Sequence, residues 1–284
     1  MQSVSKKSLE EVLHYFSFFN HALAAEEILH YIAVPASLSK VKEGLRLLVI
    51  EGLVHEKQGW FALDTESLEL RIKHEHLNKK RLKSARRVGR FIALFPFVRG
   101  VYLSGSLSKS GVQSKDDDLD FFIITASNRV WTTKFFLIAF KKIFLLNSEK
   151  YFCINLLMDQ NQLSLAKRNR YTATEVVSLV TLKNAAGLER FLQANHWVKD
   201  YFPNVALPET YAVERESTTM LERVFNRLLG GTFEQWCKKR FTIHMRTHTD
   251  LEEGYFEAEA HSSAYFPQSV EQRLMKHLEN FENE

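Results

Sequence analysis

Apolar side chains recur at helical spacing over the first fifty residues of the chain. Within residues 9–16 the apolar positions are separated by steps of three and four, which predicts an amphipathic helix. The same spacing predicts helices over residues 24–32 and 38–49. Ser37 precedes the third run as an N-cap, and Gly52 follows it where a C-terminal glycine is expected. The pattern therefore predicts three consecutive helices.

Two short apolar runs follow these helices and predict a β-hairpin. Residues 53–55 and 60–63 have strand character, and the polar, glycine-containing segment between them is typical of a turn. Three helices followed by a hairpin resemble a winged helix-turn-helix. In DNA-binding members of that fold the third helix enters the major groove, but here its basic residues are largely offset by acidic ones. We therefore favour a protein-contacting or domain-packing module, with a DNA-binding regulator as the alternative.

The rest of the chain predicts one long helix and then a mixture of strands and helices. The long helix begins after a cap at Asp64 or Thr65 and ends before Pro96. Further on, strands are expected over 98–103, 118–125 and 151–158, with a loop over 104–117 and helices over 128–145 and again from residue 172. We expect an α+β multi-domain protein composed of a winged helix at 1–64, a connecting basic helix at 65–96, a small mixed β-sheet domain at 97–170 and a helical C-terminal domain at 171–284.

The composition is that of a soluble globular protein. Hydrophobic residues make up 45% and charged residues 25% of the 284 positions, which excludes disordered and collagen-like classes. No stretch approaches the roughly 18 apolar residues that cross a bilayer, and the first residues lack the apolar core of a signal peptide. Two cysteines without a CxxC pair make a disulfide framework or a zinc site improbable. We expect a cytoplasmic protein with no membrane partner.

Positive charge is concentrated in one part of the long helix. The segment from Lys79 to Arg90 contains seven basic residues and no acidic one, although the formal charge of the whole chain is only +4. Such a run can steer a nucleotide or a nucleic acid. A solvated helix face is the interpretation we favour, and nucleic-acid binding stays open.

The residues that carry chemistry lie between positions 101 and 125. An apolar strand runs into Gly105 and Ser106, and a segment of eleven residues separates Ser106 from Asp118 and Asp120, which are followed by a second apolar strand. Residues two apart on a strand point to the same side, so the two aspartates are expected to project together. Paired carboxylates that lose hydration repel each other, and a cation relieves that repulsion.

This Gly-Ser and Asp-x-Asp arrangement resembles the signature of the polymerase-beta nucleotidyltransferase superfamily. The resemblance covers about residues 99–158 and implies that Gly105 and Ser106 hold a nucleoside triphosphate. It also implies that Asp118 and Asp120 bind the catalytic Mg²⁺ or Mn²⁺ ions. The implied reaction transfers a nucleoside monophosphate to an acceptor, which is a protein, an RNA or a small molecule. Lys109, in the same loop, either meets the triphosphate or is a solvated loop lysine.

One position departs from the family pattern. A third carboxylate usually comes from the next strand, where it helps to bind metal and to activate the attacking hydroxyl. The aligned residue here is Asn155, a neutral amide. Asp159 lies four residues on, about 13 Å along a strand, and Asp116 and Asp117 are interpreted as an exposed turn. Two hypotheses follow: an enzyme that uses Asp118, Asp120 and Asn155, or a catalytically weak nucleotide-binding regulator.

Overall fold

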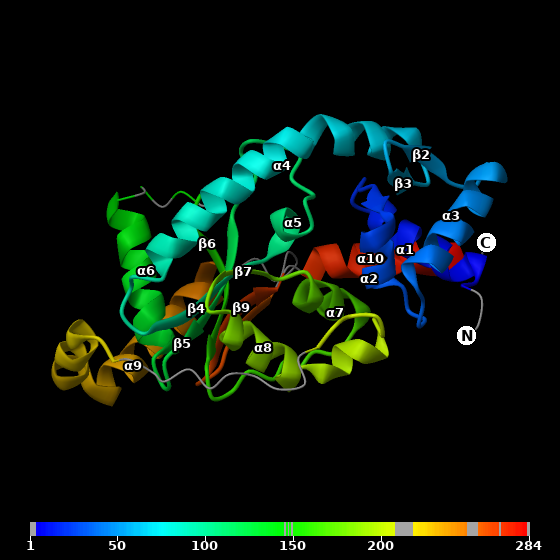
Figure 1. Cartoon of the computed structure of the whole chain (residues 1–284). Helices are drawn as coiled ribbons and strands as arrows, with labels where there is room; N and C mark the ends of the chain where they lie inside the picture. The colour runs from blue at the N-terminus through cyan, green and yellow to red at the C-terminus, as the bar shows by residue number, and fades with distance from the viewer. Residues whose placement is uncertain are drawn as a thin grey trace.

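The computed structural model describes residues 4–144, 146, 148, 150–207, 218–248, 255–266 and 268–282. It is a mixed α+β structure in which helices surround two β-sheets (Figure 1). A small sheet belongs to the first sixty residues, and a larger one is assembled from the remainder of the chain. The α+β fold class expected from the sequence is confirmed.

We call residues 6–62 the N-terminal module. It contains α1 (Lys6–Ser17), α2 (Ala25–Tyr31) and α3 (Leu38–Ile50), together with β1 (Leu23–Ala24), β2 (His55–Lys57) and β3 (Trp60–Ala62). The three predicted helices are confirmed, as is a hairpin, which turns at Gln58 and Gly59, both with positive φ. Its first strand lies at 55–57, two residues later than predicted. Strand β1 pairs with β3 to give the sheet order β1-β3-β2. Two residues are too short a strand for a sequence pattern to reveal.

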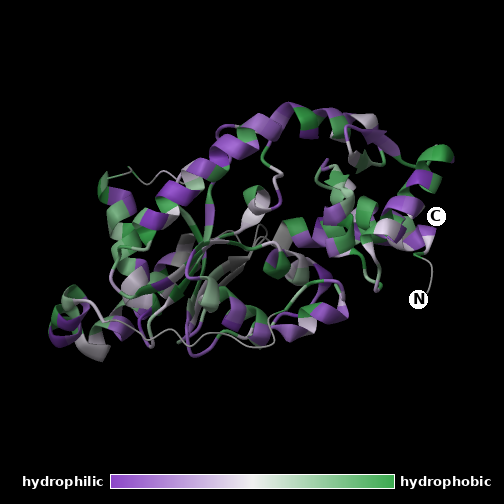
Figure 2. Ribbon diagram, in the orientation of Figure 1, coloured by the Kyte–Doolittle hydropathy of each residue, from purple (hydrophilic) through white to green (hydrophobic). Residues whose placement is uncertain are grey.

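Helix α4 (Thr65–Ile92) runs from the N-terminal module to the large sheet (Figure 1). Asp64 caps it by accepting a hydrogen bond from the Ser67 backbone N–H at 2.7 Å, and the helix ends shortly before Pro96, both as predicted. Figure 2 shows that α4 is largely hydrophilic. Its buried residues nevertheless include four polar ones, namely Ser67, Arg71, Asn78 and Arg81.

Among the described residues, the large sheet has six strands. They are β4 (Val98–Leu103), β5 (Asp120–Thr125), β6 (Cys153–Asp159), β7 (Val180–Lys183), β8 (Tyr255–Ala258) and β9 (Ser262–Phe266). Their order is β7-β4-β5-β6-β9-β8; β5 and β6 are parallel and all other neighbours are antiparallel. The parallel pair is joined by a crossover that contains α6 (Val130–Phe144).

Helices cover both faces of this sheet, because alternate strand residues point to opposite sides. Phe121 and Ile123 pack in a core with α4, α6 and α9 (Met220–His248). Phe122 and Ile124 pack on the other face, in a core that also includes the N-terminal module. That second face is covered by α7 (Arg170–Val177), α8 (Ala185–Ala194) and the short helix η1 (His196–Asp200).

The last described helix lies beside the first: helix α10 (Gln268–Glu282) packs on α1 (Figure 1). The His277 ring contacts the Ser17 hydroxyl at 3.2 Å. No helix within the described ranges combines the length and the apolar character needed to cross a membrane.

The expectation of a helical region over 171–284 is wrong. Strands β7, β8 and β9 all come from this region and join the large sheet, so a boundary at residue 170 would divide that sheet. The reason is their length and position. β7 is a four-residue edge strand whose residues alternate between half-buried and exposed, and so short a pattern between helices gives no distinct strand signal.

Candidate functional site

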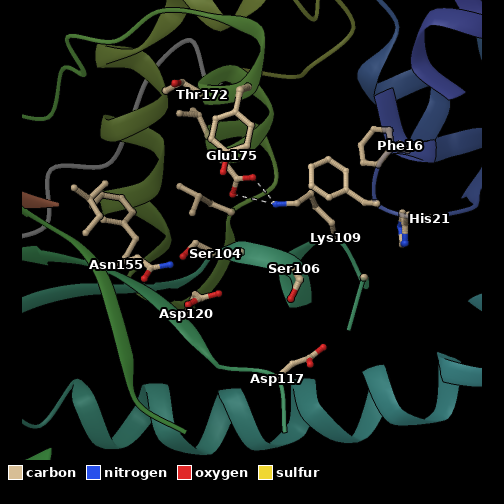
Figure 3. A pocket seen from close by; sticks show the side chains of 18 of the residues that line it. Phe16, His21, Ser104, Ser106, Lys109, Asp117, Asp120, Asn155, Thr172 and Glu175 are labelled. Atoms are coloured by element: carbon tan, nitrogen blue, oxygen red, sulfur yellow. Dashed lines mark hydrogen bonds and ion pairs between the residues drawn. The ribbon is translucent and has the colours of Figure 1, made fainter. Parts of the chain in front are cut away.

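A cavity of about 490 Å³ lies between the N-terminal module, the segment after β4, helix α7 and the face of the large sheet (Figure 3). One end is polar and the remainder is mainly apolar, with aromatic side chains from α1 and α7. The polar lining residues are His21, Ser104, Ser106, Lys109, Gln113, Asp117, Asp120, Asn155, Thr172 and Glu175. Gly105 also lines it, so four of the residues singled out from the Gly-Ser and Asp-x-Asp segment and its loop meet at one cavity: Gly105, Ser106, Lys109 and Asp120.

The turn after β4 fits closely against Asp120. Gly105 has φ +66°, and a Cβ at this position would lie 2.0 Å from Asp120 Oδ2. The Ser104 backbone N–H donates to the Asp120 carbonyl at 2.9 Å, which fixes the two segments side by side. Only glycine satisfies both the backbone angle and the close approach. Gly105 opens the four-residue helix α5 (Gly105–Ser108), which carries Ser106 at the edge of the cavity.

The Asp120 carboxylate is destabilised in its charged form. Its pKa is raised to about 6, mainly by burial, then by the negative charge of Asp118 and to a smaller extent by that of Glu175. Hydrogen bonds from Cys153 and Asn155 oppose this rise. A carboxylate in this condition gains from a nearby cation.

Asp118 lies close enough to raise the pKa of Asp120 by its charge, but it lies outside strand β5. β5 begins at Asp120, two residues later than predicted, and Asp118 is half-buried. Of the two aspartates, only Asp120 is among the described residues that line the cavity. The prediction that both project together assumed a regular strand from 118, and the pairing with β6 starts at Asp120 opposite Cys153.

Asn155 reaches the cavity because β6 contains a bulge. Phe121 pairs with Ile154 and Phe122 with Leu156, so Asn155 is the extra residue between them. Adjacent residues of a regular strand face opposite sides, yet Asn155 and Leu156 both line the cavity. The Asn155 side chain hydrogen-bonds to Asp120 and accepts from the Cys153 thiol at 3.4 Å. The structure thus puts the amide beside the aspartate, as the alignment suggested.

Asp159 lies at the far end of β6, opposite Thr125. It is buried, and its carboxylate accepts hydrogen bonds from the backbone N–H groups of Asn128 at 2.5 Å and Asn161 at 2.9 Å. These contacts hold the turn beyond the strand. Asp159 is therefore not positioned to replace the missing third carboxylate.

Sequence reasoning missed Glu175, which enters the cavity from α7. Its carboxylate oxygens lie 2.9 and 3.0 Å from Lys109 Nζ (Figure 3). The Lys109 side chain is only 13% exposed, so the solvated-loop interpretation of this lysine is wrong. No sequence motif predicts Glu175 as a site residue, because its position in the cavity depends on how α7 packs against the sheet.

Asp117 also lines the cavity. Its Oδ2 accepts hydrogen bonds from the backbone N–H groups of Gln113 at 2.9 Å and Ser114 at 3.2 Å. The expected turn is therefore present, but Asp117 is half-buried within it. Asp116 is exposed and pairs with Lys150 at 2.5 Å.

Buried polar side chains of α4 hold the loop that carries these residues. Arg71 donates to the carbonyls of Lys109 at 3.2 Å and Ser110 at 2.9 Å. Asn78 both donates to and accepts from the Val112 backbone, and Arg81 donates to the Asp117 carbonyl. A fixed backbone in this loop positions the polar end of the cavity.

Arg71 also ties the loop to the N-terminal module. Its guanidinium lies 3.0 Å from Glu27 Oε1 and 2.9 Å from His21 Nε2, and it stacks over the Trp60 ring. Burial lowers the pKa of His21 to about 3, and the positive charge of Arg71 contributes to this shift. His21 is therefore neutral at physiological pH and accepts the hydrogen bond from Arg71.

The donor set at the polar end suits a hard cation such as Mg²⁺. Asp120 supplies a carboxylate to the cavity and the charge of Asp118 acts on it, and Mg²⁺ is commonly bound by one or two carboxylates together with substrate phosphates. Ser104 Oγ is buried and has no hydrogen-bond partner among the described residues. Within the part of the chain that the structure describes, no group of three or more His, Cys, Asp or Glu side chains forms a metal site of protein ligands alone. The donor set therefore fits a cation whose remaining ligands come from a bound phosphate.

Comparison with known proteins gives no relative from which a function could be transferred. No protein-family model, no curated protein and no solved structure matches the chain. A functional conclusion therefore depends on the geometry and chemistry of the cavity.

Proposed function

We propose that this protein is a metal-dependent nucleotidyltransferase that moves a nucleoside monophosphate from a nucleoside triphosphate to an acceptor. The observation that carries the proposal is the close fit of Gly105 against Asp120 at the polar end of the cavity. The glycine turn lets phosphate oxygens approach the backbone, and Ser106 places a hydroxyl at the edge of the cavity. The adjacent carboxylate, whose pKa is raised to about 6, favours a ligand that brings positive charge.

In this proposal the chain's own groups bind and orient the nucleotide. Ser106 and the backbone of the α5 turn contact phosphate oxygens, and Lys109 neutralises part of the phosphate charge. Asp118 and Asp120 hold Mg²⁺ or Mn²⁺, which supplies the Lewis-acid stabilisation that phosphoryl transfer requires. The apolar part of the cavity, with Phe16 and Tyr171 in its lining, shields the reacting groups from water.

Asn155 favours slow transfer in this proposal. Its side chain hydrogen-bonds to Asp120 and carries no charge, so it stabilises the aspartate but takes no proton from an acceptor. General-base assistance contributes roughly 10²–10⁴-fold to rate, and nucleotide binding does not need it. A catalytically weak nucleotide-binding regulator is therefore the second function that this position supports.

A binding measurement tests the proposal before the acceptor is known. Calorimetry should detect binding of at least one Mg·NTP to the wild type and none to Asp118→Asn/Asp120→Asn. Asp200→Asn, which removes an exposed carboxylate elsewhere, should bind normally. A transfer assay with four labelled NTPs, Mg²⁺ or Mn²⁺ and a cell extract as acceptor source then separates enzyme from regulator. Equal binding by wild type and double variant would refute the site.

We also propose that the N-terminal module is a winged helix whose main role is to pack against the cavity. The helix order and the β1-β3-β2 sheet support the fold assignment. Phe16 and His21 line the cavity, and Arg71 bonds to the module and to the loop. These contacts favour domain packing over sequence-specific DNA binding. Specific retention of one DNA sequence over scrambled competitors at physiological salt would contradict this role.

The basic face of α4 supports nucleic acid as one class of acceptor. Within Lys79–Arg90, only Arg81 among the basic residues is buried, and the exposed ones are Lys79, Lys80, Lys83, Arg86, Arg87 and Arg90. Like charges three and four residues apart on a helix repel each other, so a polyanion would relieve the repulsion. RNA affinity that falls steeply with salt would support this acceptor class. Undetectable binding would leave a solvated helix face.

A further inference from the structure

An ion pair crosses the cavity between the loop and α7. Lys109 Nζ contacts both oxygens of the Glu175 carboxylate, at 2.9 and 3.0 Å, and both residues line the cavity. The side chains are 13% and 31% exposed, so water screens the pair only partly. Hydrogen bonds between charged groups are stronger than neutral ones. The pair thus holds the Lys109 ammonium on the α7 side of the cavity.

The backbone of Lys109 is held in place, whereas its side chain can change partners. Arg71 donates to the Lys109 carbonyl, and a second bond to the Ser110 carbonyl fixes the next residue. Arg71 itself is buried and bonded to Glu27. The flexible four-carbon stem of lysine can therefore redirect the ammonium while the backbone stays in place.

The distribution of charge in the cavity makes Lys109 the group for which a carboxylate and a phosphate would compete. Among the described residues that line the cavity, Lys109 is the only one with a positive charge, because the buried His21 is neutral. Asp117, Asp120 and Glu175 are the acidic lining residues. A phosphate chain near the Gly105 turn would add negative charge beside them. An ammonium bonded to two carboxylate oxygens is then less available to that phosphate chain.

We infer that Glu175 competes with the phosphates of a bound nucleotide for Lys109. This inference rests on the proposed function, since it places phosphates beside Ser106 and Lys109. When a triphosphate binds, the ammonium exchanges the carboxylate for phosphate oxygens, and Glu175 becomes unpaired. The exchange costs affinity only for a ligand that draws the ammonium away from Glu175. A triphosphate brings more negative charge to Lys109 than a monophosphate does, so it displaces the carboxylate and bears most of this cost. Glu175 is thereby a specificity-determining residue for ligand charge.

Substitution of Glu175 by Gln tests the competition. The probe is whichever of ATP, GTP, CTP and UTP binds the wild type most tightly with Mg²⁺, together with its monophosphate. Glu175→Gln should bind the triphosphate about tenfold more tightly, the size expected from freeing one charged hydrogen-bond donor. The monophosphate should change by less than about threefold. Glu175→Asp, which keeps the charge, should remain close to wild type. Glu26→Gln breaks an exposed pair with Lys42 and should change neither affinity.

Lys109 variants complete the design. Lys109→Gln should weaken triphosphate binding, and Lys109→Gln/Glu175→Gln should bind no more tightly than Lys109→Gln, because the competed group is absent. Thermal unfolding without ligand establishes that each variant is folded. If Glu175→Gln binds the triphosphate equally or more weakly, Glu175 positions Lys109 or acts elsewhere, and the inference is overturned. If folded wild type and variants bind none of the four triphosphates, the proposed function itself fails.

Discussion

Replacement of Asp120 by Asn should make the ligand-free protein more stable while abolishing nucleotide binding. The Asp120 pKa is raised from 3.8 to about 6, first by burial and then by the charge of Asp118. Each pKa unit corresponds to about 1.4 kcal/mol, so the ionised aspartate costs roughly 3 kcal/mol at neutral pH. Asn keeps the shape and removes the charge, but it loses carboxylate hydrogen bonds worth about 1 kcal/mol each. The net gain expected at about pH 7.5 is therefore roughly 1–2 kcal/mol.

The sign of the pH dependence separates this effect from simple repacking. A carboxyl with a raised folded-state pKa binds its proton more tightly in the folded state, so wild-type stability should fall as pH rises from about 4 to about 6. Asp120→Asn should lack that decline, and its advantage should shrink as the pH falls toward 4 and vanish well below the unfolded-state pKa of 3.8, where the wild-type carboxyl is neutral in both states. Urea unfolding across this range measures the difference. Asp200→Asn serves as the exposed control, and Mg²⁺ should stabilise the wild type but not Asp120→Asn.

One result would refute the reasoning about Asp120. An Asp120→Asn protein that is no more stable than wild type at neutral pH, with a difference independent of pH, would show that Asp120 is well solvated. The raised pKa and the case for a cation beside it would then both be wrong. Loss of nucleotide binding without the stability gain would leave a binding role, but not one based on relief of charge repulsion.

Three further predictions address the scaffold. Gly105→Ala should lose nucleotide binding and about 1–3 kcal/mol of stability, because Gly105 has a positive φ and lies against the Asp120 carboxylate. Calorimetry and urea unfolding measure the two effects, and Gly231→Ala, with open space around it in the described structure, is the control. Arg71→Met should cost about 3–5 kcal/mol by leaving buried partners unpaired, whereas the exposed Arg86→Met should be near neutral in urea unfolding. Burial lowers the pKa of Lys134 to about 7, so wild-type stability should rise with pH between about 7 and 10; Lys134→Met should abolish that rise, and an unchanged slope would contradict it.

The parts of the fold that were predictable are those with a local pattern. The helices of the N-terminal module and the cap at Asp64 follow from spacing and short-range chemistry. The nearness of Gly105 and Asp120 follows because β4 and β5 are antiparallel neighbours, so the turn after one strand meets the start of the other. Strands β7, β8 and β9 were missed because they are short and lie in a region dominated by helical patterns.

The parts of the site that were not predictable depend on irregular or long-range structure. The bulge at Asn155 decides which β6 residues face the cavity, and a regular alternation of strand residues cannot show where a bulge lies. Glu175 is separated from Lys109 by 66 positions and comes from another element. Arg71 lies in a hydrophilic helix where an exposed side chain would be expected, and only the packed structure reveals that it is buried.

The burial of Arg71 links the two parts of the molecule in energetic terms. Glu27 and His21 on one side and the carbonyls of Lys109 and Ser110 on the other share a single guanidinium. When a buried charge loses one of its partners, part of its desolvation free energy is no longer compensated. Separation of the module from the loop is therefore unfavourable in free energy. A ligand that depends on the position of the loop therefore also depends on the position of the module. By thermodynamic reciprocity, ligand binding stabilises the same arrangement. The N-terminal module thus forms one side of the cavity, and its packing contributes to the affinity of the cavity for a ligand bound at the polar end.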